Sequence, residues 1–247
     1  MYNTASNPGS SRAAAPPARS IPPWLVSCAE YLEQAAKGLV LVPLGLAGGR
    51  WPRLSPALRR LAGYLLVAEA AGLTAGVTAL YRPRWQLAIG QGFTLIETLF
   101  FCRIYYLTPR LPLWPRLIVW LAPLFTLFAL FATFYLEDIQ QVNACTHVGQ
   151  SGLLIALAPL CFEQLLRELQ IIRLEHDPLF LVSAAVVLYF SGTILLYGFI
   201  NYFLTAHDYA GNRVICTIHS IVSLIQYSFF ALAFWYAGRL PQAPSPS

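Results

Sequence analysis

Charged side chains are scarce in this chain. Only 11% of its 247 residues are Asp, Glu, Lys or Arg, whereas a soluble domain carries about 25%. Most of the surface must therefore face an apolar medium. The only lysine is Lys37. A light-driven retinal protein needs a lysine in its last helix, so this class is excluded.

Motifs for catalysis and cofactor binding are also missing. The five cysteines include no CxxC pair, and the four histidines form no HExxH or HxxxH frame. No GxSxG sequence and no glycine-rich nucleotide-binding loop is present. We therefore predict no catalytic residues, no metal site and no cofactor, and expect a protein that is not an enzyme.

Long apolar runs are the main positive signal. Hydrophobic residues make up 57% of the chain, and the mean hydropathy is +0.57. A helix needs roughly 20 apolar residues to cross about 30 Å of hydrocarbon. The runs are too long and too continuously apolar for the alternating strands of a barrel. The sequence thus predicts an all-α, polytopic membrane helix bundle that contacts the lipid bilayer.

Seven transmembrane helices are predicted, at residues 24–46, 61–80, 86–107, 113–135, 147–166, 179–204 and 214–238. They form one bundle at 24–239, between disordered tails at 1–23 and 240–247, which are rich in Ser, Ala and Pro. Residues 47–60 are expected to be a loop. The first span carries Glu33 and Lys37, which can pair on one helix face. If its first half lies in the membrane interface, only six helices span.

The arginines predict the orientation. With seven spans, ten lie on one side and five on the other, the five being Arg12, Arg19, Arg82, Arg84 and Arg213. The positive-inside rule places the ten in the cytoplasm. The predicted location is the inner (plasma) membrane, with the N-terminus outside and the C-terminus cytoplasmic. If the first segment does not span, both termini are cytoplasmic. Because these arginines lie in short loops, no nucleic-acid partner is predicted.

Two glutamates lie near the middle of consecutive predicted spans. Glu69 is 13 residues before Arg82 and Glu97 is 13 after Arg84, which predicts similar depths. Gly72 and Gly76 share the face of Glu69 and would let a neighbouring backbone come close. An ionised carboxylate is costly in the bilayer core. The pair is either a proton, cation or amine site, or two neutral acids that hold helices together.

A second polar set lies in the last three predicted spans. Spacings of three and four residues place Cys216, His219, Ser223 and Gln226 on one face. The ligand or proton site predicted from both sets comprises Glu69, Glu97, His147, Gln150, Asn201, His219, Ser223 and Gln226. The competing interpretation is hydrogen bonding between helices, at roughly 0.6–2 kcal/mol per bond.

Residues 176–202 read HDPLFLVSAAVVLYFSGTILLYGFINY. The Asp-Pro-x-Phe opening and the Tyr-Phe-Ser-Gly that follows resemble a group of small seven-helix bacterial integral membrane proteins. The similarity extends loosely to residues 41–48, to Glu69 and to residues 218–220. It implies an all-helical membrane fold and, as suspected for such groups, partnership with a separately encoded sensor kinase. It implies no catalytic residues.

Two functions follow as hypotheses. The first is a non-enzymatic sensing or signalling module that binds a small ligand or lipid and acts through a membrane or cytosolic partner. The second is a small proton-coupled transporter that uses Glu69 and Glu97.

Overall fold

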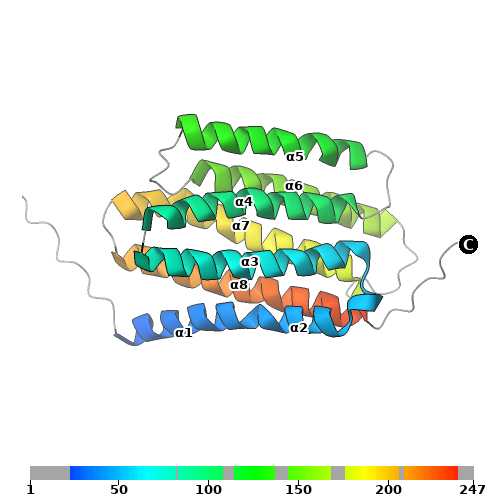
Figure 1. The fold of residues 1–247 in the computed structure, drawn as a ribbon, viewed down its shortest axis with the longest axis horizontal. Coiled ribbons are helices and arrows are strands. Elements are labelled where there is room, and N and C mark those ends of the chain that lie inside the picture. The colour runs from blue at the N-terminus through cyan, green and yellow to red at the C-terminus, as the bar shows by residue number, and fades with distance from the viewer. Residues whose placement is uncertain are drawn as a thin grey trace, which may run out of the picture.

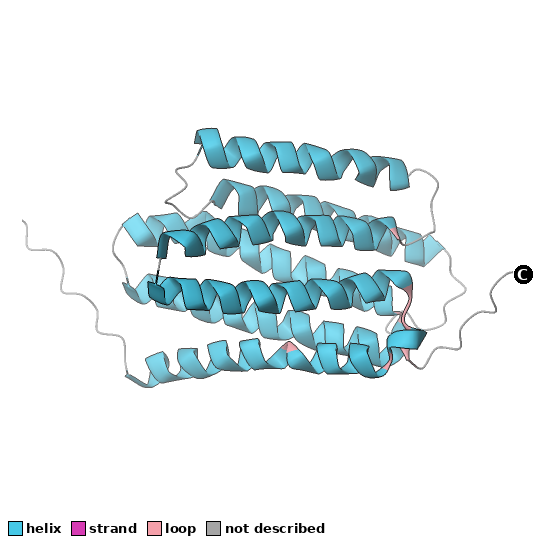
Figure 2. Ribbon diagram, viewed as in Figure 1, coloured by secondary structure: helices cyan, strands magenta, loops and turns pink. Residues whose placement is uncertain are grey.

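The computed structural model is helical throughout its described part, with no strand (Figure 2). The structure describes residues 23–81, 83–107, 114–136, 144–167, 176–205 and 209–238. The all-α prediction is confirmed. The predicted disordered tails fall outside the described residues, apart from Pro23, where the first helix begins.

The helix bounds follow the predicted spans closely. The α-helices are α1 (Pro23–Leu39), α2 (Leu41–Gly49), α3 (Pro56–Tyr81), α4 (Pro83–Tyr106), α5 (Trp114–Phe131), α6 (Ala144–Arg167), α7 (Pro178–Thr205) and α8 (Tyr209–Ala237). A π-helical segment, Ala132–Leu136, extends α5. The loop predicted at 47–60 is wrong in part. That stretch holds the end of α2, a 3-10 turn at Trp51–Arg53 and the start of α3.

The first predicted span is broken into α1 and α2, which lie end to end (Figure 1). Pro43 explains the break, because it has no N–H to donate to the carbonyl of Leu39.

Proline also marks the starts of α3 and α7. The hydroxyl of Ser55 accepts a hydrogen bond from the N–H of Leu58 just before Pro56. The carboxylate of Asp177 accepts two, from the N–H groups of Leu179 and Phe180. These are N-caps with proline at the first helical position.

From α2 onward the helices alternate in direction and pack in chain order (Figure 1). Each helix from α2 to α7 contacts the next, and α8 contacts both α1 and α2. The ring is therefore closed by its first and last members. Short connections between antiparallel neighbours favour this arrangement.

The apolar core lies toward one end of the bundle. Many of its most buried side chains come from the first half of α3, the second half of α4, the first half of α7 and the last half of α8: Leu61, Leu65, Phe101, Phe190, Phe230 and Phe234. Because neighbouring helices run in opposite directions, these halves meet at the end where α3 begins and α8 finishes. The other halves are less tightly packed.

Five helices in the described part are long and apolar enough to cross a membrane: α3, α5 with its π-helical extension, α6, α7 and α8. Their outer faces carry exposed apolar side chains, among them Leu73, Trp120, Leu124 and Leu195. Contiguous apolar faces of this kind suit lipid contact. The α1–α2 pair is interrupted and α4 is more polar, so the seven-span count stays a prediction.

A close contact between α7 and α8 at Gly192 generates a stability prediction. A Cβ atom at Gly192 would lie 3.0 and 3.2 Å from the two methyl carbons of Val222, whereas one at Gly198 on the same helix would meet no described atom within 4 Å. We expect Gly192→Leu to destabilise the protein by about 1–3 kcal/mol, because overpacking forces the helices apart. Gly198→Leu is the matched control. Thermal unfolding in detergent measures both, and equal melting temperatures would contradict the packing.

Candidate functional site

A cavity of about 430 Å³ lies between α1, α3, α7 and α8. Its lining contains charged, aromatic and apolar side chains, namely Glu33, Ala36, Lys37, Ala68, Glu69, Gly72, Leu196, Tyr197, Ile215, Cys216, His219, Ser220, Ser223 and Tyr227. Pockets for small ligands measure about 300–1,000 Å³. The volume is therefore sufficient for a small organic molecule.

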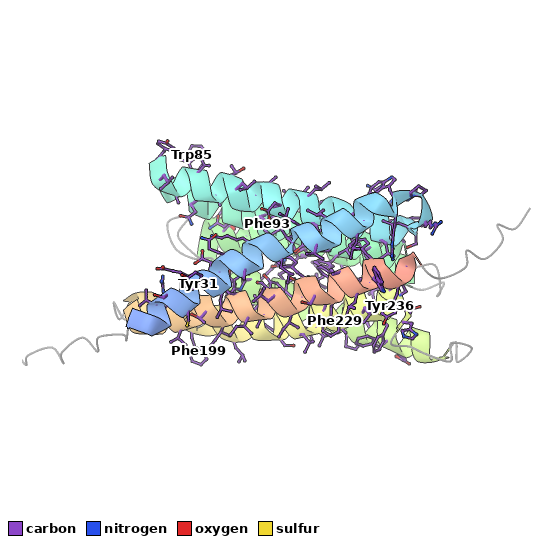
Figure 3. The ribbon with its side chains drawn as sticks, turned by 90° about the horizontal axis from the view of Figure 1, so that it is seen from below. Tyr31, Trp85, Phe93, Phe199, Phe229 and Tyr236 are labelled. Atoms are coloured by element: carbon purple, nitrogen blue, oxygen red, sulfur yellow. The ribbon has the colours of Figure 1, made fainter. Side chains whose placement is uncertain are left out.

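The cavity runs from an exposed rim to a buried floor. At the rim, Lys37 donates to Glu33 over 2.8 Å, with side chains 61% and 49% exposed. This is the pair that their spacing predicts. Ser220 and Ser223, farther in, are buried. Figure 3 shows α1 and the α3–α4 pair diverging toward the end that carries Tyr31 and Trp85 and converging toward Tyr236. The divergence leaves space where the cavity lies.

Glu69 is partly buried in the wall of this cavity, beside Gly72. The predicted close approach of another backbone to the glycine pair is wrong within this chain. A Cβ at Gly72 or Gly76 would meet no atom of the described residues within 4 Å. Gly72 instead leaves a part of the cavity wall without a side chain. Glu69 therefore faces open space rather than a helix contact.

The predicted polar stripe of α8 lies mostly on the cavity. Cys216, His219 and Ser223 line it, and Tyr227 continues the same face four residues later. Sequence reasoning missed Tyr227, although its spacing from Ser223 is the signal that could have found it. Gln226 is not part of the lining. It is buried, and its side-chain nitrogen has no hydrogen-bond partner in the described part of the chain.

Glu97 belongs to a separate buried cluster. One carboxylate oxygen accepts a hydrogen bond from the hydroxyl of Tyr64 at 2.6 Å, and the other accepts one from the amide nitrogen of Gln150 at 2.7 Å. Only 6% of Glu97 is exposed. These bonds join α4 to α3 and α6.

No hydrogen bond joins the two glutamates in the described part of the chain, and the oxygens of Glu97 accept from Tyr64 and Gln150. The similar depth predicted from the loop offsets stays a prediction.

His147 connects this cluster to the cavity. Its Nε2 lies 3.4 Å from the hydroxyl of Thr94, and Gln150 also donates to the Thr94 carbonyl at 3.3 Å. The His147 ring stacks on Tyr197, with centroids 3.8 Å apart and planes at 11°. Tyr197 in turn lines the cavity. Polar side chains therefore extend from the cavity toward Glu97.

Four tyrosines that sequence reasoning overlooked belong to this region: Tyr64, Tyr189, Tyr197 and Tyr227. The ring of Tyr189 lies 5.8 Å from that of His219. In an apolar span, tyrosine is hard to distinguish from other core aromatics, because its hydroxyl shows its role only once a partner is known. The side chain of the remaining predicted residue, Asn201, lies outside the described residues.

No group of three or more His, Cys, Asp or Glu side chains among the described residues is arranged to hold a metal ion. The cavity and the cluster behind it offer one free carboxylate, several hydroxyls and aromatic rings. This set binds and orients a ligand by charge and hydrogen bonding.

The fold and the cavity define a helical membrane-protein bundle with a polar site between its helices. Comparison of the chain with protein-family models, curated proteins and solved structures gave no match. The resemblance of residues 176–202 to a bacterial membrane-protein group therefore stays a prediction.

The Glu97 cluster generates a coupling prediction. Glu97→Leu would leave the Tyr64 hydroxyl buried without its acceptor, at a cost of about 1–3 kcal/mol. Once Tyr64 is phenylalanine, that part of the cost disappears. We expect Tyr64→Phe and Glu97→Leu to be coupled by about 0.5–3 kcal/mol in a double-mutant cycle of unfolding in detergent. The exposed Tyr135 provides the control Tyr135→Phe, for which the cycle should show no coupling. Simple additivity at Tyr64 would refute the cluster.

Proposed function

We propose that this protein is a non-enzymatic sensing module of the membrane, which binds a small molecule in the cavity and acts through a partner protein. The observation that carries the proposal is the division of the bundle into a cavity with charged and polar side chains toward one end and a packed apolar core toward the other. A site that is blocked beyond its floor suits binding better than conduction.

Helix α8 is a physical link between the two ends. It is 29 residues long, and its first half lines the cavity while its last turn joins the core. At that turn, Arg50 donates hydrogen bonds to the carbonyls of Phe234 and Trp235. Its guanidinium also lies 4.6 Å from the Trp235 ring. A ligand that displaces α8 would therefore move the α2–α3 junction.

The surface at this junction suits an acidic partner. Arg53, Arg59 and Arg60 are all exposed there, and clustered charge directs association with an oppositely charged surface. The proposed topology places this end in the cytoplasm of a cell with an inner (plasma) membrane, by the positive-inside rule. Seven membrane crossings, with the N-terminus outside, complete the proposal.

The partner hypothesis predicts a charge-dependent complex. We expect the tagged wild-type chain, extracted in mild detergent, to carry a stoichiometric partner in native mass spectrometry. The variant with Arg53→Gln and Arg60→Gln should lose it, because two charges of the docking surface are removed. Arg59 is left in place, since it donates to the Pro52 carbonyl. The matched control is Arg53→Lys with Arg60→Lys, which keeps the charge. A wild-type chain without a partner would refute the proposal.

A proton-coupled transporter is the second candidate, and the buried Glu97 is the observation that favours it. Intramembrane carboxylates commonly mark proton pathways. If this chain carries protons, Glu97→Gln should abolish proton flux into liposomes under an imposed potential, because an amide cannot exchange the proton. Glu69→Gln tests the cavity end of the same path, and Glu163→Gln is the control. Unchanged flux in both test variants would remove the glutamates from the mechanism.

A further inference from the structure

We propose that the cavity binds an organic cation, such as a protonated amine or a quaternary ammonium ion with an apolar body, and that the Glu69 carboxylate is its counter-ion. This inference rests on the proposed sensing function and names the class of ligand. Charge, ring chemistry and size support it independently.

The charges of the lining favour a cation. Its three formally charged residues are Glu33, Lys37 and Glu69. The first two form an ion pair at 2.8 Å, so their charges cancel. Glu69 has no ion pair or side-chain hydrogen bond among the described residues. An uncompensated carboxylate inside a membrane bundle favours a positive partner.

The rings of the lining favour an organic cation. Tyr197 and Tyr227 both border the cavity that Glu69 borders. Aromatic faces attract alkylammonium groups by about 0.5–2 kcal/mol. Much of the remaining lining is apolar, including Ala36, Leu196 and Ile215. Such a surface suits the hydrocarbon part of the ligand.

Metal ions and anions fit this lining less well. A calcium ion takes six to eight oxygen ligands, but the described residues form no three-membered metal-binding group. The volume of about 430 Å³ also far exceeds that of a bare ion. An anion would need the Lys37 ammonium, which is already bound to Glu33. An organic cation is the class that uses the free carboxylate and the rings together.

The structure also distinguishes Glu69 from Glu97 as the counter-ion. Both oxygens of Glu97 already accept hydrogen bonds, from Tyr64 and Gln150. Glu97 does not border the cavity, whereas Glu69 does. A ligand in the cavity would therefore meet the Glu69 carboxylate. Glu97 would be left in its structural cluster.

The test compares three probes of similar shape on the full-length chain in dodecyl maltoside, by calorimetric titration against empty micelles. They are benzyltrimethylammonium, the neutral analogue 2-methyl-1-phenylpropan-2-ol, and phenylacetate. We expect the cation to bind at least about tenfold more tightly than the other two. Glu69→Gln should abolish that preference, because it removes the charge and keeps the shape. Glu163→Gln, at an exposed glutamate of α6 away from the cavity, should retain it.

Binding of the neutral analogue reports whether the Glu69→Gln cavity is intact. If the Glu69→Gln variant no longer binds the neutral analogue, the Glu69→Asp variant is tested in its place. The preference for the cation must then survive in Glu69→Asp, because the charge is kept. Equal affinity of the wild type for cation and neutral probe would overturn the inference, as would a preference that persists in Glu69→Gln. Absence of binding by all three probes would also overturn it. The sensing function is judged separately, by partner capture.

Discussion

The carboxylate of Glu97 can be buried between helices only because two neighbouring helices each supply a donor. Tyr64 and Gln150 donate to its two oxygens, and a buried carboxylate without such donors is costly. The two bonds therefore join α3, α4 and α6 at this point. The aromatic rings of Tyr64, Phe101 and Phe190 then pack in series beside the cluster. Phe101 and Phe190 belong to the apolar core, so the core adjoins the Glu97 cluster at these rings.

The division between core and cavity follows from where large side chains are placed along each helix. The first half of α3 carries Leu61 and Leu65, which are completely buried. Its second half carries Gly72 and Gly76, which pack against nothing described within 4 Å. The large side chains of this second half, such as Leu73 and Leu80, are exposed instead. The cavity is thus a consequence of which side chains of α3 face the bundle.

Glu69 and Glu97 illustrate how environment separates two residues of the same type. Both lie near the middle of a helix, yet Glu97 has two protein donors and Glu69 faces a cavity with neither a bond nor an ion pair among the described residues. A satisfied carboxylate contributes to packing, whereas an unsatisfied one is available to a ligand. Helix α8 brings this site into mechanical contact with the arginine-rich end, through its last turn and Arg50.

The helices, their approximate bounds and the polar face of α8 could be read from the sequence, because hydropathy and three-to-four spacing are local properties. The pairing of Lys37 with Glu33 was predictable for the same reason. The partners of Glu97 were not, since Tyr64 and Gln150 are 33 and 53 residues away and only the tertiary packing brings them together. The glycines of α3 show the same limit. Their spacing suits both a helix contact and an open face, and only the tertiary packing decided in favour of the open face, since no described atom lies within 4 Å of a Cβ at either glycine.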